Sequence, residues 1–296
     1  MTPGPSIYYE CNSCKNTIEI TTIYSGNNFG ASYWTDGYVF SRMLPDSPRH
    51  RKCPHCGKLF WTKDLKKLGE VDWFWGEDEI DKSWGKPKIA LEFEATDYLS
   101  TLESNFARTN DEKKYLRTYA WWKFNDLRRW KHPEKRFYRS SIFEHIPEIT
   151  FYENLEVLEK MLDESIQSER LQKAEILREL GRFDESKNLL EFGFDERLID
   201  AKEFLEKCNE EKISTVREMT GWLNEKRERA QELYTLLKNK YIEDGIDYVK
   251  SQAIAKGMAT EENFLSVIHN LTVKEFLELR GSYKELFTIH FPKQNG

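Results

Sequence analysis

Two hydrophobic patterns divide the chain. Between residues 7 and 68, apolar and β-branched side chains alternate with polar ones, as in Ile18, Ile20 and Thr22, which share one face at a period of two. From Asp97 onward, apolar residues recur at helical spacing. We therefore predict an α+β protein, with a small N-terminal β region followed by a larger all-α domain of helical hairpins.

A hairpin signal lies inside the β region. The stretches 31–35 and 38–41 flank Asp36-Gly37. A two-residue turn of this kind needs positive φ at both central residues, which Asp and Gly tolerate. We expect this hairpin to be an insertion built onto the N-terminal sheet.

The helical region carries several start signals. Polar residues that cap helices stand before most of the apolar stripes. A third helix is expected from Thr150, with a stripe that continues to Ile166. The other predicted helices start at Thr96 or Asp97, at Asn110 or Asp111, within 171–190 as a pair, around Leu198, at Trp222, and at Thr272, where Glu275 completes a capping box.

Two Cys-x-x-Cys pairs are the most specific chemical signal in the chain. This spacing lets one tight turn direct two thiolates at a single tetrahedral ion, at about 2.3 Å from each sulfur. In the second pair, Pro54 sets a turn and Gly57 supplies positive φ. We predict one structural Zn²⁺ ion with four sulfur ligands, Cys11, Cys14, Cys53 and Cys56.

The second pair resembles the knuckle of a zinc ribbon or a rubredoxin-like site. The pairs are separated by 38 residues, more than the usual spacing of about 15 to 20, so the intervening segment must have structure of its own. Lys15 stands where a rubredoxin-like knuckle has glycine, which favours zinc over the alternative, iron. Two disulfides are a further alternative, but they require an oxidising compartment.

Composition and charge indicate a cytoplasmic protein with more than one compact unit. The chain has 296 residues, of which 32% are charged, and a net charge of −6. No apolar run approaches the roughly 20 residues that span a bilayer, and the first residues do not resemble a secretory signal. We predict a zinc ribbon at 1–68, a connector at 69–96 and a helical domain at 97–296, with a sub-boundary near 210–222.

The connector is rich in both aromatic and acidic residues. Its tryptophans include Trp73, Trp75 and Trp84. A ring of this size buries about 150 to 250 Å², so one interpretation is a strap that packs the β region against the helices. The alternative is an exposed site that binds a protein partner.

The stretch 171–190 resembles the helix-turn-helix centre of a tetratricopeptide repeat. The matching turn residues are Gly181, Phe183, Asp184, Glu185 and Ser186. Together with the cysteine pairs, this stretch resembles bacterial proteins that join a zinc ribbon to a tetratricopeptide-like helical region. The resemblance implies a non-catalytic adaptor that binds a protein partner on its helical hairpins.

An enzyme and a nucleic-acid-binding protein are the two alternatives to the adaptor. An enzyme is the least favoured, because the chain has no phosphate-binding glycine loop, no nucleophile elbow and no His-Glu-x-x-His pair. Nucleic-acid binding is the alternative, because basic residues cluster about the second knuckle and can bind phosphates. These residues are Arg49, Arg51, Lys52, Lys58, Lys63, Lys66 and Lys67.

Overall fold

The computed structural model of the chain describes residues 1–72, 81–129, 147–229, 231, 254–257 and 260. The chain divides into two compact units, Met1–Gly221 and Trp222–Gly296, and the elements below belong to the first unit. Outside the described residues lie Trp73, Trp75, the capping box at Thr272 and most of the predicted helix 222–241.

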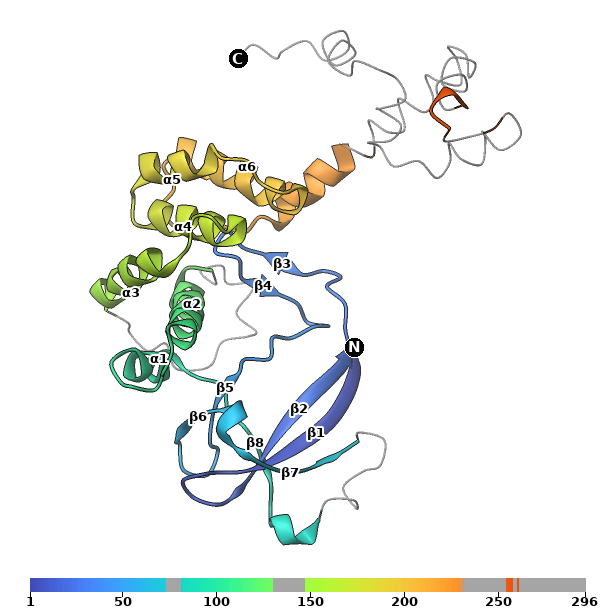
Figure 1. Ribbon diagram of the computed structural model, residues 1–296, viewed down its shortest axis with the longest axis vertical. Helices are drawn as coiled ribbons and strands as arrows, with labels where there is room; N and C mark the ends of the chain where they lie inside the picture. Colours follow the sequence, from blue (N-terminus) through green and yellow to red (C-terminus); the bar gives the residue numbers. More distant parts are fainter. Residues whose placement is uncertain (73–80, 130–146, 230, 232–253, 258–259, 261–296) are drawn as a thin grey trace. The chain divides into compact units, whose positions relative to one another are not determined.

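The protein is a mixed α+β protein, as predicted, with a sheet region before the helices (Figure 1). One sheet has the strand order β7-β1-β2-β8, in which β2 pairs antiparallel with β1 and parallel with β8. The strands of the region are β1 (Thr2–Glu10), β2 (Thr17–Ser25), β3 (Ser32–Tyr33), β4 (Val39–Phe40), β5 (His50–Lys52), β6 (Leu59–Trp61), β7 (Lys66–Val71) and β8 (Lys88–Ile89).

Strand β1 starts earlier than the sequence pattern suggests. It includes Pro3 and Pro5, which cannot donate a hydrogen bond to a neighbouring strand. The register between β1 and β2 shifts between Thr2 and Pro3, and again between Pro3 and Ser6. These irregularities accommodate the prolines, while the regular pairing from Ser6 to Glu10 leads the chain into the first cysteine pair.

The hairpin at Asp36-Gly37 forms, but two details of its prediction are wrong. Strands β3 and β4 make a separate two-stranded sheet and do not extend the N-terminal one. Gly37 has a φ of +80°, whereas Asp36 does not have positive φ. The Gly37 amide donates to the Trp34 carbonyl, and the Trp34 amide donates to the Tyr38 carbonyl. The turn is therefore a three-residue type with a glycine bulge.

The helices follow the predicted order. In the described residues they are α1 (Ala95–Leu102), α2 (Asn110–Arg129), α3 (Glu148–Met161), α4 (Gln167–Glu179), α5 (Phe183–Leu190) and α6 (Glu196–Glu210). The stripe predicted to run from Thr150 to Ile166 is divided between two helices, because α3 ends at Met161 and Ile166 is the N-cap of α4. Among the described residues, no helix is both long and apolar enough to span a bilayer.

The main hydrophobic core joins the sheet region to the helices. Trp61 of β6 and Phe93, before α1, belong to the same buried cluster as Trp121 and Phe124 of α2. Helix α2 contacts both α1 and α3, and α3 contacts α4. Trp121 and Phe124 of α2 therefore form core, whereas Tyr119 and Trp122 are only partly buried and pack against it.

Helices α4 and α5 form the predicted hairpin. Gly181 ends α4 with a φ of +76°, the left-handed conformation typical of a residue after a helix. The Ser186 hydroxyl donates to the Ala174 carbonyl at 2.7 Å, and Asn209 of α6 donates to the Ser186 oxygen at 2.9 Å. Arg182 is the N-cap of α5, and Asp184 lies in the first turn of this helix.

Candidate metal centre

The two cysteine pairs lie on turns with the same backbone hydrogen bonds. In the first turn, the Lys15 amide donates to the Cys11 carbonyl and the Cys11 amide donates to the Asn16 carbonyl, both at 3.0 Å. The second turn repeats this arrangement with Gly57, Cys53 and Lys58, at 2.9 Å for both bonds. Lys15 and Gly57 have φ values of 63° and 72°. Each pair is therefore a knuckle closed by a left-handed residue.

The knuckles bring the four sulfurs together. The Sγ atoms of Cys11 and Cys56 are 3.9 Å apart, and those of Cys14 and Cys53 are 3.8 Å apart. All four sulfurs lie within 4.8 Å of one another. A regular tetrahedron with metal–sulfur bonds of about 2.3 Å has edges of about 3.8 Å. The four cysteines can hold a metal ion, and their distances exceed the roughly 2.05 Å of a disulfide bond.

The surroundings of the sulfurs differ. Cys11 and Cys53 are buried in a small cluster with Ile18, Phe60 and Leu65, whereas Cys56 is exposed. Burial raises the pKa of the Cys53 thiol to about 12. A buried thiol of this kind ionises only when a cation compensates the charge, and a bound metal ion does so.

In the first knuckle, the pKa of the Cys14 thiol is lowered to about 6. The largest cause is a hydrogen bond from the Asn16 side chain. His55, between the ligands of the second knuckle, is not part of the sulfur cluster. Its Nε2 atom lies 3.0 Å from the carbonyl oxygen of Thr17 and so connects the second knuckle to β2.

Several of the basic residues around the second knuckle contact other parts of the chain. The Nζ atom of Lys52 lies 2.9 Å from Asp97, and that of Lys63 lies 2.6 Å from Glu112. Lys67 pairs with Glu70, and Lys66 approaches Glu10. The Arg49 guanidinium lies over the Tyr115 ring. Arg51 is buried, whereas Lys58 is exposed.

Trp84 is the one predicted partner-binding tryptophan within the described residues. Its ring packs against Tyr8, with 4.9 Å between the ring centroids. It also covers Gly69 of β7, where an added Cβ atom would lie 2.5 Å from the indole. Its carbonyl accepts a hydrogen bond from the Thr17 hydroxyl. The ring is half-buried on the sheet.

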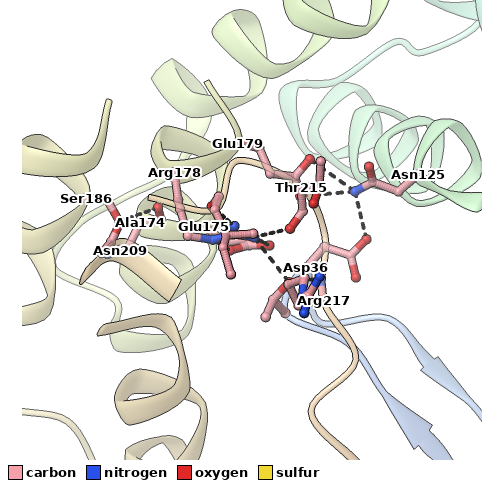
Figure 2. A network of polar contacts seen from close by, with 12 residues as sticks. Asp36, Asn125, Ala174, Glu175, Arg178, Glu179, Ser186, Asn209, Thr215 and Arg217 are labelled. Carbon is pink, nitrogen blue, oxygen red and sulfur yellow. Dashed lines mark hydrogen bonds and ion pairs between the residues drawn. The ribbon is translucent and has the colours of Figure 1, made fainter. Parts of the chain in front are cut away.

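A second polar cluster, which the sequence did not indicate, lies between the β3–β4 hairpin and the helices (Figure 2). Arg178 and Glu175 of α4 form a buried bidentate ion pair, with distances of 2.7 and 2.6 Å. Arg178 also donates to the Thr215 carbonyl at 3.1 Å. On α2, Asn125 donates to Asp36 and to Glu179, at 3.1 Å each.

This polar cluster has a structural role, because its residues are buried. Asp36, Glu175 and Arg178 are each 0% exposed, so no substrate reaches them from solvent. Burial, followed by the negative charge of Glu175, raises the pKa of Glu179 above its usual range. Glu175 and Arg178 are three residues apart on a helix, the spacing of an ordinary surface ion pair, so the sequence alone gave no sign of their burial.

Comparison of the chain with protein-family profiles, with curated protein sequences and with solved structures finds no match. The functional conclusion therefore depends on the geometry of the chain itself.

Proposed function

We propose that the protein is a non-catalytic zinc-binding adaptor, in which one structural Zn²⁺ ion fixes the N-terminal β region and the helical hairpins bind a protein partner. The observation that carries the proposal is the cluster of four sulfurs on two matching knuckles. Four protein ligands fill a tetrahedral shell and leave no position for a substrate or a catalytic water. This favours a structural ion.

The knuckle geometry also supports the zinc-ribbon interpretation. Each Cys-x-x-Cys turn is followed by a left-handed residue, and both turns are continuous with strands of the sheet region. Zinc is favoured over iron because it is the usual ion of a closed structural site. The two metals are distinguished by colour, because Zn²⁺ has a filled d shell and its sites are colourless. Binding of such an ion by two knuckles on separate turns is coupled to folding of the segment between them.

The helical hairpin provides the proposed partner surface. Helices α4, α5 and α6 share a core of Ala174, Leu177, Leu190 and Leu205, so the hairpin has packing of its own. Phe192, which follows α5, is 60% exposed. Aromatic residues are enriched at the core of protein–protein interfaces, so we choose this exposed ring as the position that tests the proposed partner surface.

Nucleic-acid binding is the second proposal and rests on the exposed basic residues of the knuckle region. Lys58 is exposed, and Lys66 is 4.0 Å from its nearest carboxylate. Lys52 and Lys63 are already paired with carboxylates, which lowers the charge that they offer to a phosphate. A purified protein that binds single-stranded DNA or RNA, with affinity that falls steeply as salt is added, would favour this proposal over the adaptor.

The metal centre is tested by Cys53→Ser combined with Cys56→Ser. We expect the wild type to contain one zinc atom per chain by elemental analysis and to be colourless. The double variant should lose the metal and part of its near-ultraviolet circular dichroism. An unchanged metal content would refute the proposed site, and a red, iron-containing protein would refute the choice of zinc.

The adaptor role is tested by affinity capture with and without nuclease, using Phe192→Ser beside the wild type. We expect a captured protein that survives nuclease treatment and is reduced by the variant. Glu191→Gln, a change at the neighbouring exposed position, is the matched control. Capture that disappears with nuclease would contradict the adaptor and support the nucleic-acid proposal.

A further inference from the structure

An aromatic cavity lies between the β3–β4 hairpin, the segment 45–48 and helix α2. It has a volume of about 250 Å³. The buried rings of Phe93 and Tyr98 contribute to its lining. Four half-buried rings complete the aromatic lining, those of Tyr38, Phe40, Tyr119 and Trp122.

The rings contact one another, so the cavity wall is fixed by packing. The centroids of Tyr119 and Trp122 are 4.9 Å apart, and those of Tyr38 and Trp122 are 5.8 Å apart. The Trp122 indole donates to the Asp36 carbonyl at 2.9 Å, which holds the ring in place. Such a wall holds several rings in place without the need for a rearrangement on binding, and the face of an aromatic ring is electron-rich.

The lining is also acidic. It includes three carboxylates, Asp46, Glu92 and Asp126, and one ammonium group, Lys123, and so carries a net charge of −2. Asp46 and Glu92 are exposed. Burial, followed by the negative charge of Asp126, raises the pKa of the Tyr38 hydroxyl above its usual range.

Two cations near the cavity have carboxylate partners: Lys123, which lines the cavity, and Arg129, which does not. The Nζ atom of Lys123 lies 3.4 Å from Glu94, and Arg129 pairs with Asp36 and Asp126. The Arg129 guanidinium lies 4.4 Å from the centroid of the Tyr38 ring. One ring of the group thus already contacts a cation in the folded protein.

We propose that this cavity binds an organic cation, an alkylammonium or guanidinium group, between its aromatic rings and its carboxylates. Aromatic faces attract such cations, and carboxylates add a charge-assisted contact. The volume is below the roughly 300 to 1,000 Å³ of pockets for drug-sized ligands, so the site suits one head group or one side chain. None of the four cysteines lines the cavity, and the inference does not depend on the metal centre.

The cation can come from a free small amine or from a lysine or arginine side chain of a protein. Isothermal titration of the full-length, metal-loaded protein distinguishes these sources. The probes are choline, its uncharged isostere 3,3-dimethyl-1-butanol, and short glycine-serine peptides with one central lysine, trimethyllysine or arginine. We expect at least one cationic probe to bind about tenfold or more tightly than the isostere. Tighter binding of choline indicates a small amine, and tighter binding of a peptide indicates a protein partner.

Two sets of variants test the position of the site. Phe40→Leu keeps an apolar side chain but removes a ring, and should weaken binding of the cation about three- to thirtyfold, whereas Phe40→Tyr should retain it. Asp46→Asn with Glu92→Gln should weaken binding at least threefold and flatten its salt dependence. Glu191→Gln with Glu210→Gln removes the same charge at exposed positions outside the cavity and should leave binding unchanged.

Circular dichroism of each variant shows whether it is folded before its affinity is compared. The proposal is refuted if no cationic probe binds saturably at millimolar concentration, or if the isostere binds as tightly as the cations. It is also refuted if Phe40→Leu and the Asp46 and Glu92 double variant, both folded, bind the cation like the wild type.

Discussion

Lys15 and Gly57 occupy the same position in the two knuckles, and both have positive φ. This conformation costs a residue with a Cβ atom about 1–2 kcal/mol, and glycine almost nothing. An added Cβ at Gly57 would lie 3.9 Å from the Lys52 side chain, an ordinary contact, so Gly57→Ala adds only the conformational cost. We expect it to lower the free energy of unfolding by about 1–2 kcal/mol, and Lys15→Gly to raise it by up to about 1 kcal/mol, as measured by urea unfolding.

A glycine outside the knuckles provides the control for this pair. Gly85 has a φ of +73° and no atoms within 4 Å of an added Cβ, but it lies outside the knuckles. Gly85→Ala should cost a similar free energy and leave zinc affinity unchanged in competition with a chromogenic chelator. If Gly57→Ala likewise left zinc affinity unchanged, the left-handed residue would not be part of the metal centre.

His50 is a buried titratable residue beside the second knuckle. It is 1% exposed, and its Nε2 atom lies 2.8 Å from the Tyr98 hydroxyl oxygen. Burial is the main cause that lowers the pKa of His50 to about 3, whereas the unfolded chain has a pKa of about 6.5. Because the unfolded state binds the proton first, the free energy of unfolding should decrease as pH falls from about 6.5 to about 3, by up to about 1.4 kcal/mol per pH unit.

His50→Phe removes this titration and should reduce the slope of stability against pH on the acid side of about pH 6.5. Above that pH the variant should be less stable by about 1–3 kcal/mol, because the buried Tyr98 hydroxyl loses its partner. Both proteins keep the four cysteines, so acid release of the metal contributes equally and cancels in the comparison. Parallel pH profiles from urea unfolding would contradict the assigned pKa.

At the scale of elements, the β3–β4 hairpin is held against α2 by an ion pair. Asp36 and Arg129 are both buried, and their side chains pair directly. Asp36→Asn leaves the guanidinium buried without that charge, and we expect a loss of about 3–5 kcal/mol in the free energy of unfolding. Addition of Arg129→Met should recover most of this loss, because it removes the unpaired charge.

Asp126→Asn is the matched control for the ion pair. Asp126 also pairs with Arg129, but its side chain is 34% exposed, and the expected loss is below about 1 kcal/mol. If Asp36→Asn cost no more than Asp126→Asn in the same unfolding experiment, the pair would not hold the hairpin. A double variant less stable than Asp36→Asn would show that Arg129 has other important partners.

These elements also show what the sequence could predict. Local signals located the hairpin turn, the α4–α5 hairpin and both knuckles, because each depends on residues a few positions apart. The turn type was wrong because it depends on Asp36, whose partner Arg129 lies 93 residues further along the chain. The burial of Arg178 likewise depends on Thr35 and Thr215, from two distant segments that cover α4. Pairing over such distances leaves no local pattern to read.

At the scale of the molecule, an ion bound by the four cysteines would close a loop of 38 residues between the knuckles. That loop contains β2 and the β3–β4 hairpin. Closing a loop of about 40 residues is worth about 4 kcal/mol in the chain-entropy treatment of cross-links, comparable with the total stability of a marginal domain, about 5–15 kcal/mol. The core around the sulfurs is small, and it includes two of the ligands themselves, Cys11 and Cys53.

Removal of the metal should therefore unfold the sheet region before the helices. With a chelator, we expect hydrogen exchange measured by mass spectrometry to lose protection in β1, β2, β5 and β6. Helices α4–α6 should keep most of theirs, since their cluster of Ala174, Leu177 and Leu205 contains no metal ligand. Equal loss of protection in all these elements would instead show that the ion supports the whole first unit.

Two single cysteine variants separate this effect from general damage by the chelator. Cys56→Ser removes an exposed ligand and should reproduce the exchange pattern of the metal-free protein without chelator. Cys208→Ala removes a buried thiol of α6, whose pKa is raised to about 11 by burial, and should leave both metal content and protection of the sheet region unchanged. Each variant removes one sulfur. A difference in hydrogen exchange between the two variants therefore follows from whether the removed sulfur belongs to the four-cysteine cluster. If Cys56→Ser kept full protection in β1 and β2, the fold of the sheet would not depend on the ion.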